Sequence, residues 1–390
     1  MKITFFSNYL NHHQLPFCLE MIKLHGNDFK FVATTPINQE RLSLGYEDMN
    51  KKYSFVVTTY DSSENYEKAI DLALKSDVII HGSAPEEFIK KRMQLNKLTF
   101  RYSERIFRHN VWKRYFSKTL LHIFKNHTIY KNKNLYMLCA SAYTPYDYAA
   151  AGAYLNKTYK WGYFPEVIIY DNIEKLIEFK HPSSILWVAR LIEWKHPEIP
   201  IYIANRLKND GYTFNLNIIG IGEMESQLKN MISKMHLDDC VHMLGSMKPE
   251  NVRKYMEQSQ IFLFTSDRRE GWGAVLNESM NSGCAVIANH AIGSVPFLLK
   301  SGENGLIYKN GDKEDVYQKV KLLLDNSDLC KKYGINAYKT MANFWNPKTA
   351  TERFSNLAKQ LLRKDKFPDI YESGPCSKAK ILKDNWWYKS

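Results

Sequence analysis

Short runs of β-branched and apolar residues alternate with helix-like stretches from the first residue of this chain onward. This alternation is typical of a parallel sheet that carries helices on its faces. In the first part of the chain we expect six strands in one doubly wound α/β domain, at residues 3–7, 29–34, 53–58, 77–81, 98–102 and 135–140.

A second series of the same kind follows a helix-poor stretch that is punctuated by proline, from Trp161 to Pro182. Its expected strands lie at 185–189, 214–219, 241–244, 261–264, 285–288 and 306–308. Two consecutive Rossmann-like domains that face each other bring the carboxyl ends of both sheets to one cleft, where ligands of open α/β sheets bind. The sequence therefore predicts an N-terminal domain at 1–170, a C-terminal domain at 171–343, a C-terminal helix at 344–363 that is a candidate to cross back to the first domain, and a basic aromatic tail at 364–390.

Composition excludes several classes of protein. Hydrophobic residues make up 44% of the chain, enough for packed cores, and no apolar stretch approaches the roughly 20 residues that span a bilayer. The apolar run at the N-terminus is short and lacks a small-residue cleavage site, so it predicts a buried strand and a cytoplasmic protein. The six cysteines are scattered, which argues against a disulfide framework or a zinc site and indicates reduced, mostly buried thiols.

The formal net charge of +13 is unevenly distributed, because residues 90–134 hold thirteen lysines and arginines against one acid, Glu104. Such a block attracts an anionic partner. Within it, residues 111–125 predict a helix with apolar positions at 112, 115/116, 119/120 and 123/124 and basic residues beside them. This pattern fits an anionic membrane surface, and it fits equally a helix that packs on its own domain. Nucleic acid is not expected as a partner, because no binding module accompanies the charge.

Residues 261–283 read as a buried strand, a loop bracketed by glycines and a helix, with two carboxylates eight positions apart. Glu270 lies in the loop, Gly271 and Gly273 let the backbone turn closely around a ligand, and Glu278 lies about one turn into the helix, which ends at Gly283. Ionised carboxylates accept directional hydrogen bonds and so suit sugar hydroxyls. Taken alone, the pair is equally compatible with two exposed acids beside an ordinary loop.

This stretch resembles the Glu-x7-Glu signature of the family-4 retaining glycosyltransferases, and the resemblance covers residues 184–325. It implies the GT-B fold, with an acceptor domain first and a donor domain second. By the resemblance, Glu270 contacts hydroxyls of the donor sugar and Glu278 holds the ribose of the nucleotide. Arg190 and Lys195 match the cations that grip the donor diphosphate, where positive charge stabilises the departing phosphate. Without the glutamates, these two cations would read as solvated surface residues.

Further donor contacts are implied at three short segments. Gly220 and Gly222 resemble the Gly-x-Gly turn of the family, and the remaining positions are Gly245, Ser246 and Met247 near the nucleobase and Gly271, Trp272 and Gly273 in the loop after Glu270. The implied co-substrate is a nucleoside-diphosphate sugar. No cofactor and no metal are expected, since the chain lacks an Asp-x-Asp motif.

The N-terminal domain matches the family less closely. Its first loop lacks the expected glycines and carries Asn11, His12 and His13, which are candidates to face the acceptor or simply form a polar loop. Arg101 stands near the place where many relatives carry a histidine. His81 is the nearest imidazole, and a structural and a functional role are equally open for it.

The resemblance implies a retaining hexosyltransferase, similar to enzymes of bacterial capsular and exopolysaccharide assembly. It would move a sugar from its nucleotide to a hydroxyl of a saccharide or lipid-linked acceptor, in the cytoplasm or peripherally at the inner membrane face. Two other readings share the architecture. One is a sugar-nucleotide epimerase or hydrolase, and the other is a non-catalytic relative that binds membranes or carbohydrate.

Overall fold

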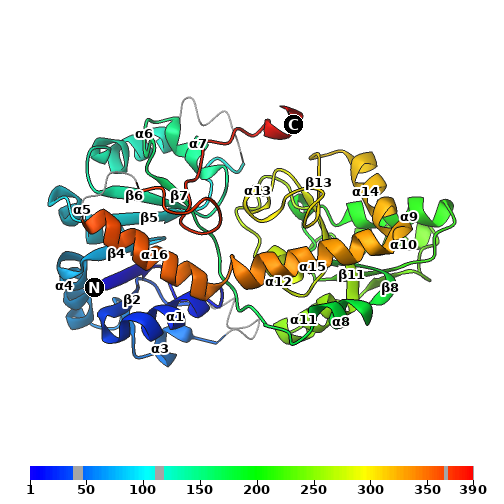
Figure 1. The fold of residues 1–390 in the computed structure, drawn as a ribbon, viewed down its shortest axis with the longest axis horizontal. Helices are drawn as coiled ribbons and strands as arrows, with labels where there is room; N and C mark the ends of the chain where they lie inside the picture. Colours follow the sequence, from blue (N-terminus) through cyan, green and yellow to red (C-terminus); the bar gives the residue numbers. More distant parts are fainter. Residues whose placement is uncertain (38–46, 110–117, 364–367, 390) are drawn as a thin grey trace. The chain divides into compact units, whose positions relative to one another are not determined.

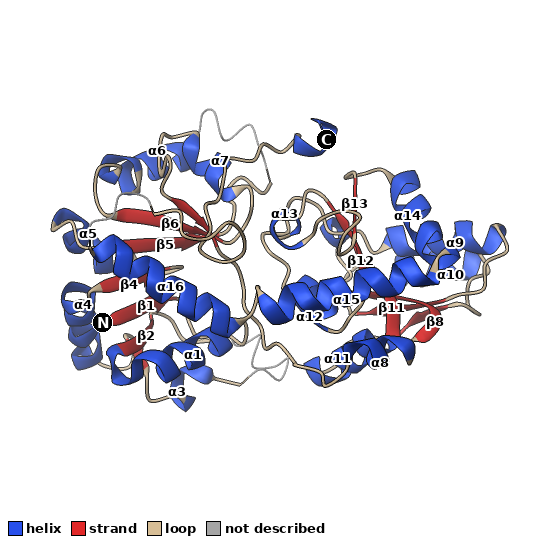
Figure 2. Ribbon diagram, in the orientation of Figure 1, coloured by secondary structure: helices blue, strands red, loops and turns tan. Residues whose placement is uncertain are grey.

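The computed structural model describes residues 1–37, 47–109, 118–363 and 368–389. The chain forms two compact units. The first contains Met1–Glu166 and Asn346–Lys383, and the second contains Val167–Trp345 and Asp384–Ser390. Figure 2 shows helices packed around the strands in each unit.

The first unit contains a parallel sheet in the order β3-β2-β1-β4-β5-β6-β7. The chain moves outward from β1 on one side and then returns to place β4 on the other side of β1. All five residues of β1 and of β6 are buried, as expected for strands covered on both faces. The strands are β1 Ile3–Ser7, β2 Phe29–Ala33, β3 Val56–Thr58, β4 Val78–His81, β5 Thr99–Ser103, β6 Leu135–Cys139 and β7 Thr158–Lys160.

The six strands predicted for this unit are confirmed, but the prediction missed β7. This strand has only three residues and ends directly before the helix-poor stretch that begins at Trp161. Its outer edge is covered by the C-terminal segment, because the amide of Lys160 donates to the carbonyl of Ser377 at 2.7 Å and the amide of Ala379 donates to that of Thr158 at 3.0 Å. The segment therefore protects an edge that would otherwise expose unpaired backbone groups.

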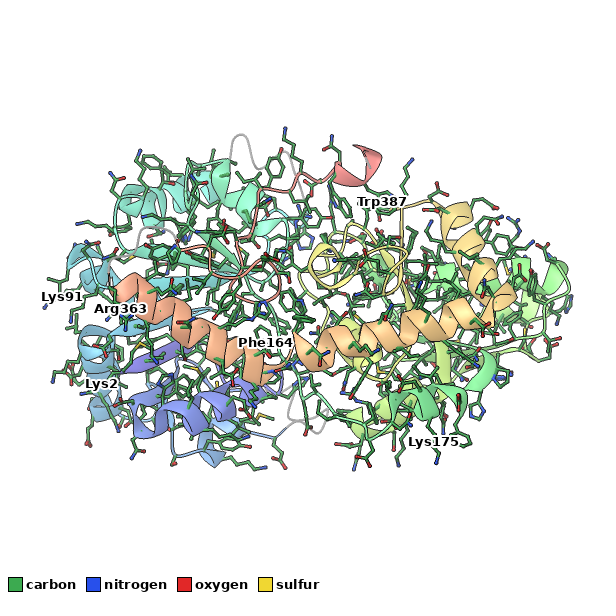
Figure 3. The ribbon with its side chains drawn as sticks, viewed as in Figure 1. Lys2, Lys91, Phe164, Lys175, Arg363 and Trp387 are labelled. Carbon is green, nitrogen blue, oxygen red and sulfur yellow. The ribbon has the colours of Figure 1, made fainter. Side chains whose placement is uncertain are left out.

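Helix α16, Pro347–Leu362, returns to the first unit and is drawn in orange in Figure 1. Asn346 caps it by accepting a hydrogen bond from the amide of Thr349 at 2.8 Å, and Pro347 occupies its first turn. Its Phe354 packs on Phe100 of β5, with ring centroids 5.1 Å apart. Nearby, the ring of Phe164, labelled in Figure 3, packs on Trp161 at 4.8 Å. The other helices of this unit are α1 Leu15–His25, η1 Gly26–Asp28, α3 Met49–Lys52, α4 Ser63–Lys75, α5 Glu87–Gln94, α6 Lys118–Asn126, η3 Thr128–Tyr130 and α7 Thr144–Ala149.

The second unit contains a parallel sheet in the order β10-β9-β8-β11-β12-β13. All six strands predicted here are confirmed, with bounds that differ by a few residues at most. They are β8 His181–Val188, β9 Asn215–Ile219, β10 Val241–Met243, β11 Ser259–Phe264, β12 Ala285–Asn289 and β13 Leu306–Tyr308. The helices are α8 Ile173–Glu178, η4 Glu193–Lys195, α9 Glu198–Asn209, α10 Glu225–Lys234, α11 Pro249–Gln258, α12 Val275–Asn281, α13 Val295–Leu298, α14 Lys313–Asp325, α15 Ser327–Asn343 and η5 Trp386–Lys389.

The aromatic tail ends on the second unit. The ring of Trp387, labelled in Figure 3, stacks on His290 with centroids 6.2 Å apart and planes 19° apart. All six cysteines are free and buried, in agreement with the prediction. None of the helices in the described part of the chain is both long and apolar enough to cross a bilayer.

Candidate functional site

The second sheet reverses its strand order between β8 and β11, since the chain continues from β8 to β9 on one side and returns on the other. At such a switch point the loops after the two strands diverge and leave room for a ligand at the carboxyl ends. Arg190 and Lys195 follow β8, and Glu270 follows β11. These three predicted donor residues therefore follow the two strands that flank the switch point.

Lys195 and Glu270 are joined directly, because the Lys195 ammonium donates a hydrogen bond to Oε2 of Glu270. Both side chains are largely buried, with exposed fractions of 12% and 11%. The ammonium also lies 4.3 Å from the centroid of the Trp194 ring. A shielded ion pair of this kind places a cation and an acceptor side by side, which is the combination that a sugar diphosphate requires.

A second charged group, which was not predicted from the sequence, directly follows Lys195 in the chain. His196 donates from Nδ1 to Glu198 at 3.0 Å, and its Nε2 lies 3.5 Å from Oδ2 of Asp267. Hydrogen bonds with Asp267 and Glu198 raise the pKa of His196 to about 9, against the opposing effect of burial. Burial disfavours ionised Asp267, but hydrogen bonds from His196 and Arg269 outweigh it and lower the pKa of Asp267. His196 is therefore an imidazolium at neutral pH.

Protonated His196 should stabilise the fold. Its pKa is raised from about 6.5 to about 9, so this stabilisation is complete below pH 6.5 and is lost as the pH rises through 9. Asparagine tolerates the left-handed backbone of His196, at φ 52°, and does not titrate. We expect the melting temperature of wild type to fall more between pH 6.5 and 9 than that of His196→Asn. The measurement is a calorimetric pH series. If the melting temperatures of the two proteins fell equally between pH 6.5 and 9, protonated His196 would not stabilise the fold.

Gly220 and Gly222 let the loop after β9 approach the segment that carries Arg190. A Cβ on Gly220, at φ 148°, would lie 1.8 Å from the carbonyl oxygen of Ala189, and one on Gly222 would lie 2.4 Å from that of Leu191. The amide of Gly220 also donates to the carbonyl of Gly245 at 2.8 Å. The loops after β8, β9 and β10 are thus held together by backbone contacts that exclude larger side chains.

The remaining predicted donor residues occupy different environments. Arg190 and Ser246 are exposed, Met247 is half-buried, and the side chain of Arg190 makes no hydrogen bond or ion pair within the described residues. Glu278 lies one turn into α12, where Arg253 donates to its carbonyl oxygen at 3.1 Å. Burial raises the pKa of Glu278, and the charge of Arg253 opposes that rise. Among the described residues, the carboxylate of Glu278 has no hydrogen-bond partner.

The loop after Glu270 is shaped by packing. Gly273 has φ 79°, and a Cβ there would lie 2.3 Å from the ring of Phe264. Gly271 is buried beside it. The indole of Trp272 was predicted to bind the donor, but it is fully buried (0% exposed) and donates to Oδ1 of Asn277 at 2.9 Å. Trp272 therefore anchors the loop in the core.

The first unit contains a cavity of about 390 Å³ at its own switch point, between β1 and β4. Its lining comes from the loops after β1, β4 and β5 and from α6 and neighbouring segments. The charged and polar side chains of the lining include Gln14, His81, Glu86, Arg101, Glu104, Arg108 and His127.

Arg101 lines this cavity and binds two other residues of its wall. It donates from Nη2 to both carboxylate oxygens of Glu86 at 2.6 and 2.7 Å, and from Nη1 to Nδ1 of His81 at 2.8 Å. His81 in turn donates from Nε2 to the carbonyl of Pro85 at 3.1 Å. Burial and the charge of Arg101 lower the pKa of His81 well below its usual range. Both ring nitrogens of His81 are occupied, so the structure favours a structural role for it.

Glu86, His122 and His127 also lie close enough for their ligand-type atoms to fall within 4.8 Å of one another. The guanidinium of Arg101, however, binds Glu86 and approaches Nε2 of His127 to 3.5 Å. Arg101 therefore supplies positive charge next to these three residues.

The predicted acceptor residues of the first loop have mainly local partners. Oδ1 of Asn11 accepts from the amides of His13 and Gln14, each at 3.0 Å. The His12 and His13 rings lie 3.7 Å apart, and His13 stacks on Tyr163 at 5.6 Å. Asn11 thus shapes the turn that leads into α1, and it also lines the cavity.

The basic block at 90–134 is less exposed than its composition indicates. Arg92, Arg101 and Arg105 are at most 3% exposed. Arg92 donates to the carbonyls of Ala73, Ser76, Asp77 and Leu98 and so ties α4 and α5 to the sheet. Lys113 and Arg114, together with positions 112, 115 and 116 of the predicted membrane helix, lie outside the described residues.

Comparison with known protein families identifies the second unit. Residues 170–340 match the family described as glycosyl transferases group 1. They form a glycosyl transferases group 1 domain. This group 1 domain contains Arg190, Lys195, Glu270 and Glu278, so the ion pair and the switch point described above belong to it.

Two relatives illustrate the similarity of the group 1 domain. The amylovoran biosynthesis glycosyltransferase AmsK of Erwinia amylovora is 34% identical over 138 residues, which are 34% of this chain and 34% of that protein. A Campylobacter jejuni N-acetylgalactosaminyltransferase that acts on a diphospho-undecaprenol-linked saccharide is 32% identical over 137 residues, 35% of this chain and 36% of its own. The chain thus matches about a third of the length of these curated relatives.

Solved structures match this chain over both of its units. Anabaena HepE in complex with UDP aligns with a TM-score of 0.69 and 15% identity, covering 92% of this chain and all of that one. The apo form of the lipopolysaccharide outer core galactosyltransferase WaaB aligns with a TM-score of 0.65 and 16% identity, covering 94% of this chain and 100% of its own. The fold is therefore GT-B, with two Rossmann-like units, as the sequence predicted.

Proposed function

We propose that this protein is a retaining glycosyltransferase that moves a sugar from a nucleoside diphosphate to an acceptor hydroxyl. The observation that carries the proposal is the shielded Lys195–Glu270 pair at the switch point of the group 1 domain. Lys195 and Arg190 would hold the diphosphate, Glu270 the sugar hydroxyls and Glu278 the ribose. Gly245, Ser246 and Met247 would meet the nucleobase through the loop after β10.

In this reaction the bond from the anomeric carbon to the diphosphate breaks, and a bond from the acceptor oxygen to the same carbon forms. Attack from the face of departure retains the configuration, and the departing phosphate takes the proton of the acceptor hydroxyl. Positive charge near the phosphate lowers the barrier, because negative charge grows on the leaving oxygen. No side-chain base is needed, in keeping with a His81 whose two ring nitrogens are already occupied.

The names of the relatives support an acceptor that is a saccharide or a lipid-linked saccharide, in assembly of a surface polysaccharide or glycolipid. An epimerase or hydrolase of the same fold would also bind the nucleotide, but it would release free sugar or isomerised donor. The test is a mass-spectrometric screen of nucleotide sugars with oligosaccharide and extracted-lipid acceptors. A product heavier by one glycosyl unit supports transfer, whereas free sugar without that product would contradict it.

We also propose that α6 brings the protein to an anionic membrane, with the rest of the chain in the cytoplasm. On this helix Leu121 and Phe124 are each 52% exposed, and Lys118 and Lys125 are exposed beside them. Ile123 is buried, so the apolar positions 123 and 124 of the predicted stripe face opposite ways. Exposed apolar residues flanked by lysines suit the interface of an anionic bilayer.

Replacing Leu121 and Phe124 by serine should reduce binding to vesicles that contain anionic lipid by about tenfold, because two half-exposed apolar side chains are lost. The measurement is co-sedimentation at low salt. Leu155→Ser, which removes another exposed leucine (56%), should leave binding unchanged. If wild type does not sediment with the vesicles, the membrane proposal is wrong.

A further inference from the structure

The cavity of the first unit has its charged side chains paired with one another. Arg101 binds Glu86 through two hydrogen bonds of 2.6 and 2.7 Å, and Arg108 lies 2.5 Å from Oε2 of Glu104. Of the described residues that line the cavity, these are the two arginines and the two carboxylates, so their charges cancel. We infer that this cavity binds an uncharged saccharide unit of the acceptor and excludes anionic sugars. The inference rests on the proposed glycosyl transfer and names the acceptor class at this site.

The buried histidines of the wall do not add positive charge. His81 is 2% exposed and His127 is 6% exposed. Burial and the nearby Arg101 lower the pKa of each well below its usual range. An anionic ligand would therefore meet two arginines that are already neutralised and two carboxylates that repel it.

Two buried polar atoms in the wall lack a partner and indicate what the ligand offers. Among the described residues, Oε1 of Gln14, an acceptor, and Nε of Arg101, a donor, have no hydrogen-bond partner, and the two residues are 8% and 3% exposed. Both residues line the cavity. Leaving such atoms unpaired is costly, so a ligand that satisfies them binds more tightly. A sugar hydroxyl both donates and accepts, so the hydroxyls of one sugar ring can satisfy both atoms without a charged group.

The size and the aromatic content of the cavity fit the same ligand. Its volume of about 390 Å³ lies at the lower end of the range for small-molecule pockets. Four tyrosines contribute to the lining, namely Tyr9, Tyr102, Tyr148 and Tyr163. Their rings offer apolar faces and polar edges, which complement the C–H faces and hydroxyl rim of a sugar ring.

The test compares glycosides that differ only at C6, where a hydroxymethyl group is replaced by a carboxylate. Methyl glucoside and methyl glucuronide form one pair, and methyl galactoside and methyl galacturonide form the other. Binding to the full chain is measured by NMR titration. We expect wild type to bind at least one neutral glycoside about tenfold more tightly than its uronide.

Glu86→Gln frees the charge of Arg101 and should tighten uronide binding by about tenfold, with little change for the neutral partner. Glu104→Gln, which frees Arg108 on a different ion pair, should shift the preference in the same direction and decides the matter if the Glu86 variant does not fold. Glu87→Gln is the matched control, because it removes an exposed carboxylate one position along α5.

The inference is overturned if wild type binds no neutral glycoside, if it binds a uronide as tightly as its neutral partner, or if neither glutamine variant that folds changes the ratio. Nucleoside diphosphate binding, measured in parallel by thermal shift, separates this outcome from failure of the proposed function. Diphosphate binding without neutral glycoside binding would refute the acceptor class alone. Glycoside binding without diphosphate binding would refute glycosyl transfer and leave the cavity as a sugar site.

Discussion

Replacing Glu270 by Gln is expected to slow glycosyl transfer by about 100-fold or more, because the negative charge of Glu270 serves two partners. The carboxylate pairs with Lys195, and in the proposed complex it accepts hydrogen bonds from the donor sugar. The amide still offers an oxygen to Lys195, so the fold should survive with a loss of about 1–3 kcal/mol. The measurement is the initial rate of nucleoside diphosphate release in the presence of acceptor, together with a melting curve.

The control for this variant is Glu250→Gln, which removes an exposed carboxylate at the start of α11 in the same unit. It should leave the rate unchanged. A Glu270→Gln protein that melts near wild type and transfers sugar at the wild-type rate would show that the donor site has been placed wrongly.

Gly220→Ala is expected to destabilise the second unit by about 3 kcal/mol or more. The new Cβ would lie 1.8 Å from the carbonyl oxygen of Ala189, and φ at this position is 148°. Neither the backbone of β8 nor that of β9 can retreat without breaking ladder hydrogen bonds between the two strands. Chemical denaturation would measure the loss of stability.

Gly211→Ala separates the steric clash from the backbone strain. Gly211 has φ 81°, but a Cβ there would meet nothing within 4 Å, so we expect a loss of only about 1 kcal/mol. Equal losses for the two variants would mean that the tight contact between the loops after β8 and β9 does not exist in solution.

The strands could be predicted because each is a short, strongly apolar run in a parallel sheet. Residues 261–264 are buried throughout, and such runs are recognisable without any partner. β7 could not be predicted in this way. Its three residues are ordered by pairing with β6 and with residues 376–379, more than 200 positions along the chain.

The donor site was predictable where the signal is local. Glu270 and Glu278 lie in one strand–loop–helix segment. In the structure Glu270 forms an ion pair with Lys195, one of the two predicted cations. The contact between His196 and Asp267 was missed because the two residues are distant in sequence, although His196 directly follows Lys195. The burial of Trp272 could not be predicted, because residue type does not reveal which way a side chain in a glycine-rich loop points.

The basic block shows how far composition can mislead. A count of charges cannot tell that Arg92 satisfies backbone carbonyls inside the first unit or that Arg101 is paired with Glu86. Glu86 belongs to no sequence motif. Its pairing with Arg101 follows only from the position of α5 beside β5. The charge and exposure of the cavity wall could therefore not be predicted from the sequence.

The central claim is that the group 1 domain binds the diphosphate of a sugar nucleotide through Arg190 and Lys195. It is tested most directly by melting curves of the full chain with UDP, GDP, ADP, CDP and dTDP, in wild type and in Arg190→Ala. Lys300→Ala, which removes a lysine that is 75% exposed, serves as the control. We predict that at least one diphosphate raises the melting temperature of wild type and of the control by about 3 °C or more, and that Arg190→Ala loses most of this shift. The claim would be contradicted if no diphosphate stabilised wild type, or if Arg190→Ala kept the full shift.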